Sequence, residues 1–332
     1  MSQTNKSSYK KMFSLLDNDE EDLFEHEIIK RIKADYDRFH KHDFLAFEKL
    51  LNENEIVCPK CGSTNFISHG FDKNKAKRYK CKECNSTFNE AKNTLFFSSK
   101  INLEAWFVFL ECLLSGSSTS EACINAKISK VTGSKWMKKI FITLKNYQDS
   151  ILLNNGDIYI DETYIHVDES KTYRLEEEGK IKKVKKLPRG ISRNMICILV
   201  ATDTKVSFAE IVCLGRPQRL KNYNICKKHI LPNSHLISDE DNSLVYTINE
   251  LNLTRTQIKS NTEEAYKTLE PVDKLCSRLK FFIDKHRGFK KDGLQDYLNL
   301  FIYIDNETHK ENDLYKVTVK LLKMMFSYTK SK

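Results

Sequence analysis

The sequence predicts a multidomain protein in which small N-terminal modules precede an α/β domain with a mixed sheet flanked by helices. Three observations predict this organisation. Two C-x2-C pairs, Cys58/Cys61 and Cys81/Cys84, stand in the N-terminal third. Helical patterns fill residues 100–150. From residue 157, apolar strand patterns come first and helices and strands then alternate, which is typical of a mixed sheet covered by helices.

Length and charge limit the classes of protein that the chain can represent. The 332 residues suffice for two or three domains, and the net charge of +10 favours a polyanionic partner, most commonly nucleic acid. A merely basic globular protein is the alternative. The opening residues lack the apolar core of a signal peptide, and no run approaches the roughly 18 apolar residues that span a membrane. We therefore expect a soluble, cytoplasmic protein associated with the nucleoid.

Residues 1–52 predict a helical arm. An acidic cluster, 'DNDEEDLFEHE', precedes a stretch in which apolar residues recur at helical spacing. A packing role is favoured over any site there.

Residues 53–95 predict a zinc ribbon. Four cysteines at this spacing suit one structural, tetrahedral Zn²⁺, because each pair forms a tight knuckle and the intervening segment folds as a hairpin. Free buried thiols or disulfides are the alternative. Basic residues near the second pair are predicted to contact DNA phosphates, namely Lys77, Arg78 and Lys80.

Residues 100–150 predict a helix-turn-helix domain with helices at about 102–114, 119–127 and 132–147. Ser117 to Ser120 supply caps for the second helix, and Ser129 or Thr132 caps the third. The apolar stripe of the third helix leaves its polar residues on the outer side, where they are predicted to contact DNA: Ser134, Lys135, Lys138 and Lys139. An ordinary three-helix bundle with a solvated lysine face is the alternative.

The α/β domain is predicted over residues 155–310, followed by a C-terminal helix over 311–332. Its strands are 'DIYIDETYIHV', 'RNMICILVATD', 'VSFAEIVCL' and 'HLIS', with a helix around 217–230 before the last of them. The loop between the first two strands is strongly basic, and a nucleic-acid contact is favoured over a solvated loop for Lys185, Lys186 and Arg189.

Carboxylates stand where this domain would present a site. Asp161 lies inside the first strand, where a charge is costly without a partner, and Asp239 ends the strand 'HLIS'. A helix with Pro271 as its first residue carries Glu270, Asp273 and Lys280 on one face. Convergent carboxylates bind Mg²⁺, and two such ions can promote phosphoryl transfer. Singly, Asp239 could cap a turn and Glu270 its helix.

Three motifs in this order resemble bacterial insertion-sequence transposases of the DDE class with an N-terminal zinc ribbon. The motifs are 'RYKCKECNSTFNE' with 'FFSSKINLEAWF', 'DIYIDETYI', and 'SRLKFFIDKHRGFKKDGLQDYLNLFIYIDN', and the resemblance covers residues 56–306. It implies a ribonuclease-H-like catalytic core that requires two Mg²⁺, with Mn²⁺ as a substitute. Asp161 and Asp239 match the first two catalytic acids, and Glu270 is favoured over Asp273 as the third. Lys280 is expected to contact DNA.

The resemblance implies a transposase that binds the terminal inverted repeats of an insertion sequence. It would cleave DNA strands and transfer them to a target, working as a homodimer or larger synaptic complex. Two alternatives stay open. One is a sequence-specific DNA-binding protein that derives from a transposase and does not cleave. The other is a nuclease of the same fold acting on RNA or branched DNA.

Overall fold

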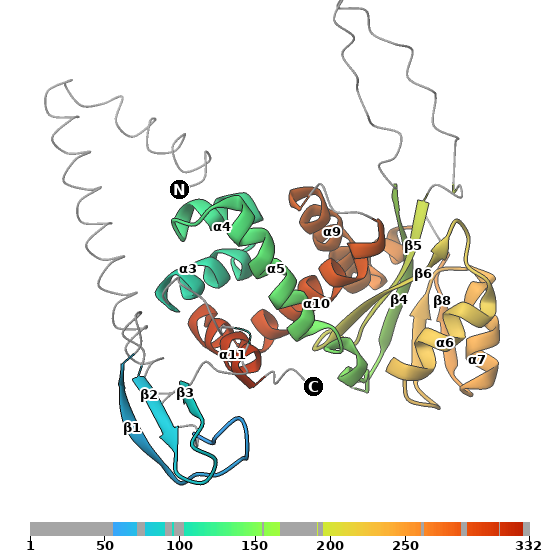
Figure 1. The fold of residues 1–332 in the computed structure, drawn as a ribbon. Helices are drawn as coiled ribbons and strands as arrows, with labels where there is room; N and C mark the ends of the chain where they lie inside the picture. Colours follow the sequence, from blue (N-terminus) through green and yellow to red (C-terminus); the bar gives the residue numbers. More distant parts are fainter. Residues whose placement is uncertain are drawn as a thin grey trace, which may run out of the picture. The chain divides into compact units, whose positions relative to one another are not determined.

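The computed structural model describes residues 56–71, 77–89, 95, 103–154, 156–166, 191, 195–259, 262–286, 291–311 and 313–327. The predicted helical arm over 1–52 lies outside these ranges, as do Lys185, Lys186 and Arg189. The chain divides into two compact units, residues 1–90 and 91–332 (Figure 1).

The described part of the first unit is a three-stranded antiparallel sheet with the order β1-β2-β3. Its strands are β1 (Phe66–Phe71), β2 (Lys77–Cys81) and β3 (Thr87–Asn89). One face of the sheet packs a small aromatic core, in which the ring of Phe66 lies 5.0 Å from Tyr79 and 5.6 Å from Phe88. So small a core buries too little apolar surface to stabilise a module of this size unaided.

Three helices open the second unit: α3 (Leu103–Leu114), α4 (Thr119–Asn125) and α5 (Lys130–Leu144). Ser118 caps α4 in a reciprocal capping box with Glu121, and Ser129 caps α5. Both N-caps are therefore serines that the sequence predicted as caps. The rings of Trp106 and Trp136 stack 3.7 Å apart between α3 and α5. The predicted segments 100–150, 155–310 and 311–332 all belong to this one compact unit.

The second unit contains a five-stranded mixed sheet, as predicted. Its order is β6-β5-β4-β7-β8, with antiparallel pairs on the β5 side of β4 and parallel pairs on the β7 side. Its strands are β4 (Ile158–His166), β5 (Met195–Thr202), β6 (Ser207–Leu214), β7 (His235–Ser238) and β8 (Thr254–Gln257). The sequence did not predict β8.

Helices cover both faces of this sheet (Figure 1). On one side lie α6 (Arg219–His229) and α7 (Val245–Glu250), and on the other α9 (Glu270–Lys285), which contacts β4 and β5, and α10 (Leu294–Lys310), which contacts β6. Helix α11 (Leu314–Ser327) packs against α3 and α5. The short elements are α8 (Glu263–Thr268), η1 (Gln148–Ser150), η2 (Asn242–Leu244) and η3 (Lys291–Gly293).

Helix α9 buries the predicted apolar stripe but begins at Glu270, one residue before Pro271. No helix in the described ranges is both long and apolar enough to cross a membrane.

At Gly133, helix α5 passes so close to Cys123 of α4 that no room is left for a side chain. A Cβ built on Gly133 would overlap the sulfur of Cys123. We expect Gly133→Ala to lower the free energy of unfolding by about 1–3 kcal/mol, although Gly to Ala normally stabilises a helix. Urea unfolding followed by tryptophan fluorescence measures this, because both tryptophans, Trp106 and Trp136, lie in the same unit.

The double variant Gly133→Ala/Cys123→Ala should recover most of that loss, since it removes the overlapping sulfur. Ser134→Ala, on the exposed side of α5, is the matched control. A Gly133→Ala protein as stable as the wild type would contradict the close approach.

Candidate functional site

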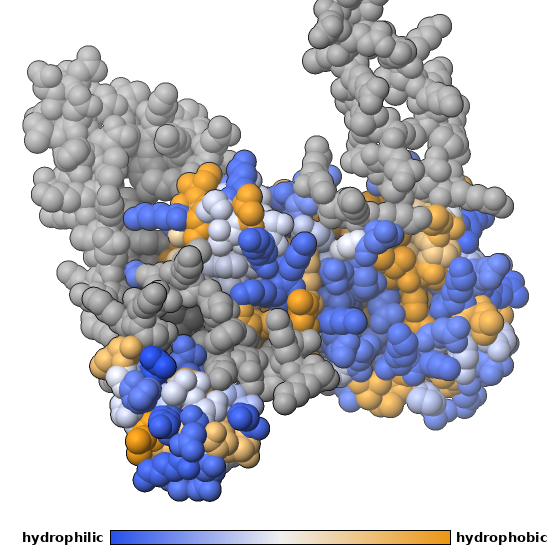
Figure 2. Space-filling model, viewed as in Figure 1, coloured by the Kyte–Doolittle hydropathy of each residue, from blue (hydrophilic) through white to orange (hydrophobic). Residues whose placement is uncertain are grey.

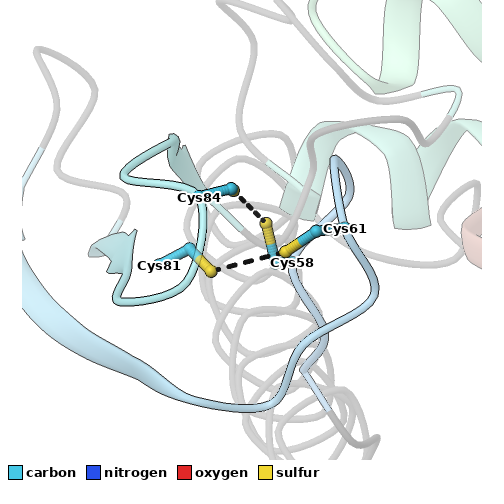
Figure 3. A group of neighbouring side chains, drawn as sticks. All are labelled: Cys58, Cys61, Cys81 and Cys84. Carbon is cyan, nitrogen blue, oxygen red and sulfur yellow. Dashed lines mark hydrogen bonds between the residues drawn. The ribbon is translucent and has the colours of Figure 1, made fainter.

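Cys58, Cys61, Cys81 and Cys84 converge in the first unit, and their sulfur atoms all lie within 4.8 Å of one another (Figure 3). Cys58 and Cys84 are 3.6 Å apart between sulfur atoms, as are Cys61 and Cys81. A disulfide requires about 2.05 Å, whereas a tetrahedral Zn²⁺ with Zn–S bonds of about 2.3 Å separates its sulfurs by about 3.8 Å. The four cysteines therefore fit one tetrahedral metal ion and do not form disulfides.

The backbone of each C-x2-C pair forms a knuckle that directs both thiols inward. Cys58 N–H donates to Ser63 O at 2.8 Å, and Cys81 N–H donates to Ser86 O at 2.9 Å. The residue after each pair, Gly62 or Asn85, has a positive φ, at 72° and 55°. Burial is the largest influence on Cys58 and opposes its ionisation. Hydrogen bonds from the N–H groups of Lys60 and Cys61, together with the thiols of Cys84 and Cys61, outweigh burial and lower the pKa of Cys58 to about 6, which favours the thiolate that metals bind.

The basic residues of the ribbon lie on both faces of β2. Arg78 and Lys80 project from the face opposite Tyr79, because side chains alternate along a strand. Lys77 lies on the aromatic side instead, with its ammonium 5.6 Å from the ring centre of Tyr79. Arg78 and Lys80 therefore share a face that is available for an anionic partner.

The predicted outer face of α5 is only partly free. Ser134, Lys135 and Lys138 are exposed. Lys139 is half-buried, lies 5.6 Å over the ring of Trp106, and donates to the carbonyl of Leu95. Lys139 thus contributes to packing, whereas the other three residues remain on the surface.

On the face shown in Figure 2, hydrophilic residues predominate and hydrophobic ones form separate patches.

The parallel pairing of β4 and β7 brings Asp161 and Asp239 to the same level of the sheet. Ile158 pairs with Leu236 and Tyr159 with Ile237, so the same register, continued by two residues, sets Asp161 beside Asp239. Asp161 is half-buried in mid-strand, and Asp239 follows the last residue of β7. The loop at Asp239 is a local turn, in which Asp239 Oδ1 accepts a hydrogen bond from Asp241 N–H at 3.1 Å.

Asp273 and Glu270, the two candidates on helix α9, lie in different surroundings. The charges of Asp239 and Asp273 both act on Asp161, whereas Glu270 pairs with Lys274 at 2.9 Å and its side chain is 56% exposed. Cys276 is buried one turn beyond Asp273. Burial raises the pKa of its thiol, and the charges of Asp161 and Asp273 add to this rise. Burial raises the pKa of Asp273, and the positive charge of Lys280 opposes this rise without cancelling it. Lys280, which was predicted to extend this face of the helix, is exposed.

The pKa of Asp161 rises from 3.8 to about 6. Burial is the largest cause, and the negative charges of Asp239, Asp273 and Glu162 add to it. The N–H of Glu162 opposes the shift by donating to Asp161 Oδ1 at 2.7 Å. A cation at this site would offset the repulsion, and carboxylate oxygens are the donors that Mg²⁺ and Mn²⁺ prefer. Among the described residues, the four cysteines are the group whose ligand atoms lie close enough together to hold a metal ion. The carboxylate oxygens of the three acids are farther apart than the cysteine sulfurs.

Arg255, which the sequence analysis did not single out, fixes the loop that carries Asp239. From β8 its Nε donates to Ser238 Oγ at 2.9 Å, and its Nη2 donates to the carbonyls of Asp239 and Asp241 at 2.5 and 2.8 Å. The only sequence signal was the pair of threonines in 'TRTQ', which favours a short strand.

The opposite face of β4 is held by a separate polar network. Asn222 of α6 donates to Glu162 Oε1 at 2.7 Å, and the hydroxyl of Tyr164 donates to Glu162 Oε2 at 2.8 Å. Glu162 therefore has a positioning role for the strand and is directed away from Asp161, its neighbour in sequence.

Comparisons with known proteins give short or distant likenesses. No family model matches the chain. A stretch of 55 residues is 36% identical to an uncharacterized protein in transposable element ISH50 of Halobacterium salinarum, covering 17% of this chain and 18% of that protein. The match thus spans less than a fifth of the relative's length.

Two of the similar solved structures are of Mos1. The strand transfer complex has a TM-score of 0.32 with 13% identity, over 68% of this chain and 78% of that chain. The catalytic domain of Mos1 mariner transposase has a TM-score of 0.32 with 11% identity, over 58% of this chain and 92% of that chain. TM-scores this low do not establish a shared fold.

We expect the purified protein to contain one zinc ion per chain, measured by atomic absorption. Cys81→Ser should lose this ion, because one thiolate of four is removed. Cys213→Ser, a half-buried cysteine of the other unit, is the matched control and should keep it. Equal zinc content in both variants would contradict the four-cysteine site.

Asp161→Asn should stabilise the metal-free protein at high pH. Between about pH 4 and pH 6 the folded protein retains a proton on Asp161 that the unfolded chain has lost, so ionisation costs stability as the pH rises through this window. The variant should therefore gain roughly 1–3 kcal/mol at pH 8, and the gain should vanish near pH 4.

Urea unfolding at the two pH values measures this difference, with Glu250→Gln, exposed at the end of α7, as the control. A gain that is equal at both pH values would show that burial and charge do not act on Asp161 as described.

Proposed function

We propose that this chain is a transposase of the DDE class with a ribonuclease-H-like core, in which an aspartate takes the third position. It would bind double-stranded DNA at the ends of a mobile element, cleave there and transfer strands to a target. The observation that carries the proposal is that the charges of Asp239 and Asp273 both act on Asp161, although the three acids come from separate elements, the end of β7, α9 and β4. The short match to a transposable-element protein agrees with it.

The three aspartates would hold divalent metal ions, Mg²⁺ or Mn²⁺. Bound there, such ions supply Lewis acidity for phosphoryl transfer and lower the pKa of water. The part played by the protein is positional. The β4–β7 register and the Arg255 contacts fix Asp161 and Asp239, and the packing of α9 against β4 and β5 fixes Asp273. Asp161 must lose its proton to serve as a ligand, so activity should fall below about pH 6.

DNA recognition is assigned to two surfaces. On the ribbon, Arg78 and Lys80 would contact phosphates, which supply affinity without reading sequence. On α5, exposed Ser134, Lys135 and Lys138 would face the duplex as the second helix of a helix-turn-helix does. Lys280 would contact DNA beside Asp273. Two element ends must be held together, so the active form would be a homodimer or a larger synaptic complex.

Cleavage of a duplex that carries the end of the element tests the proposal. The wild-type chain with Mg²⁺ should nick it, and Asp161→Asn should reduce the rate by at least about a thousandfold, because a metal ligand is lost. Incision that persists in Asp161→Asn would reject the assignment. Binding without incision under any metal would favour the DNA-binding protein that does not cleave, and preferential cutting of RNA hybrids or branched DNA would favour the nuclease.

The third acid is tested by comparing Asp273→Asn with Glu270→Gln. We expect Asp273→Asn to lose as much activity as Asp161→Asn, and Glu270→Gln to stay within about threefold of the wild type, because its pair with Lys274 is exposed. If Glu270→Gln loses activity and Asp273→Asn retains it, the third acid is Glu270 and not Asp273.

A further inference from the structure

A polar cavity of about 130 Å³ lies on the flank of α9 that faces away from Asp273. Lys274 and Arg278 are one and five residues beyond Asp273, so they project from a different side of the helix. The turn between β5 and β6 and the last turns of α10 complete the cavity. The lining residues that matter here are Thr204, Lys205, Lys274, Arg278, Asp305 and His309.

The lining is rich in positive charge. Lys205, Lys274 and Arg278 contribute three cations against one carboxylate, that of Asp305. Asp305 is 5% exposed and accepts hydrogen bonds from Arg278 Nε at 2.7 Å and Nη2 at 3.2 Å. This pair orients the guanidinium and leaves its remaining N–H groups for a further acceptor. Among the described residues, the ion-pair partner of Lys274 is Glu270, in an exposed contact that an anion can replace.

The turn that carries Lys205 is rigid. Buried Asp203 accepts hydrogen bonds from the N–H groups of Lys205 at 3.1 Å, Val206 at 2.9 Å and Asn154 at 3.2 Å. Thr204 is in the left-handed region with a φ of 70°. Lys205 itself is exposed, and in the described parts of the chain its ammonium has no carboxylate partner. Lys205 is therefore available at a fixed edge of the cavity.

We propose that this cavity holds a phosphate of a nucleic-acid backbone. Two lysines and an oriented arginine converge on it, which is the donor set that a phosphodiester prefers. The volume exceeds the roughly 30 Å³ occupied by one water, so an anion and its hydration fit. The inference rests on the proposed function and deepens it. The bound phosphate fixes the duplex against α9 and so sets the register of the strand relative to Asp273.

DNA binding by the full chain without added magnesium tests the cavity separately from catalysis. Fluorescence anisotropy with a random-sequence duplex, over a range of salt concentrations, gives the affinity and its salt dependence. Lys205→Gln/Lys274→Gln should bind about tenfold more weakly at about 100 mM salt and reduce the salt slope by about 1. Arg278 is left unchanged, because its removal would leave Asp305 buried without its cation.

Lys221→Gln/Lys227→Gln is the matched control. It removes the same charge from exposed lysines of α6, on the opposite face of the sheet, and should leave the slope unchanged. Equal slopes for the two double variants, or no binding by the wild type, would overturn the inference. If the wild-type chain shows no cleavage activity but the two double variants still differ in slope, the proposed transposase function is rejected and the phosphate site in the cavity is retained.

A second arm separates a DNA phosphate from free phosphate. Thermal unfolding is compared in inorganic phosphate and in chloride at matched ionic strength. Stabilisation of the wild type but not of Lys205→Gln/Lys274→Gln by inorganic phosphate, with equal DNA binding by both, would show a site for free phosphate and overturn the DNA assignment.

Discussion

Asp161 lies in mid-strand on β4, paired with Val200 of β5, and the rest of the carboxylate site depends on the register of β4 with β7. That parallel register brings Asp239 level with Asp161, and α9 adds Asp273 from one face of the sheet. Each added acid increases the repulsion at a partly desolvated carboxylate. The fold therefore places like charges together at a cost in stability, which is typical of a site whose purpose is to bind a cation.

The surroundings of Asp161 hold these acids against their repulsion. Arg255 anchors the carbonyls of the loop that carries Asp239, although Arg255 lies on β8, the last strand of the sheet. On the other face, Asn222 and Tyr164 hold the side chain of Glu162. Strand β4 is thus fixed from both faces and through both neighbouring strands. Such support keeps side chains in place when the charge of the site changes.

Sequence patterns predicted the elements that bury apolar side chains and missed those that do not. Strands β4 to β7 and the stripe of α9 have continuous or periodic apolar residues, whereas β8 is a four-residue polar strand formed by backbone pairing with β7. Spacing alone could not choose between Glu270 and Asp273, because their directions depend on how α9 rotates against β4 and β5. Lys139 resembled its exposed neighbours in sequence, and only the position of Trp106 shows that it packs.

The two candidate metal sites differ in how much of the chain must fold to create them. The cysteine knuckles are local turns, and the sequence pattern was sufficient to predict that these four cysteines converge. A metal ion can therefore stabilise the ribbon as it forms, because binding and folding are coupled in so small a module. The carboxylates come from residues 161, 239 and 273, and they meet only after the sheet has formed and α9 has packed on it. Divalent metal can be expected to contribute little to folding of this unit, since its hydrophobic core forms the site in advance. This difference agrees with the roles proposed for the two sites, a structural one for a metal ion at the cysteines and a chemical one for the carboxylates.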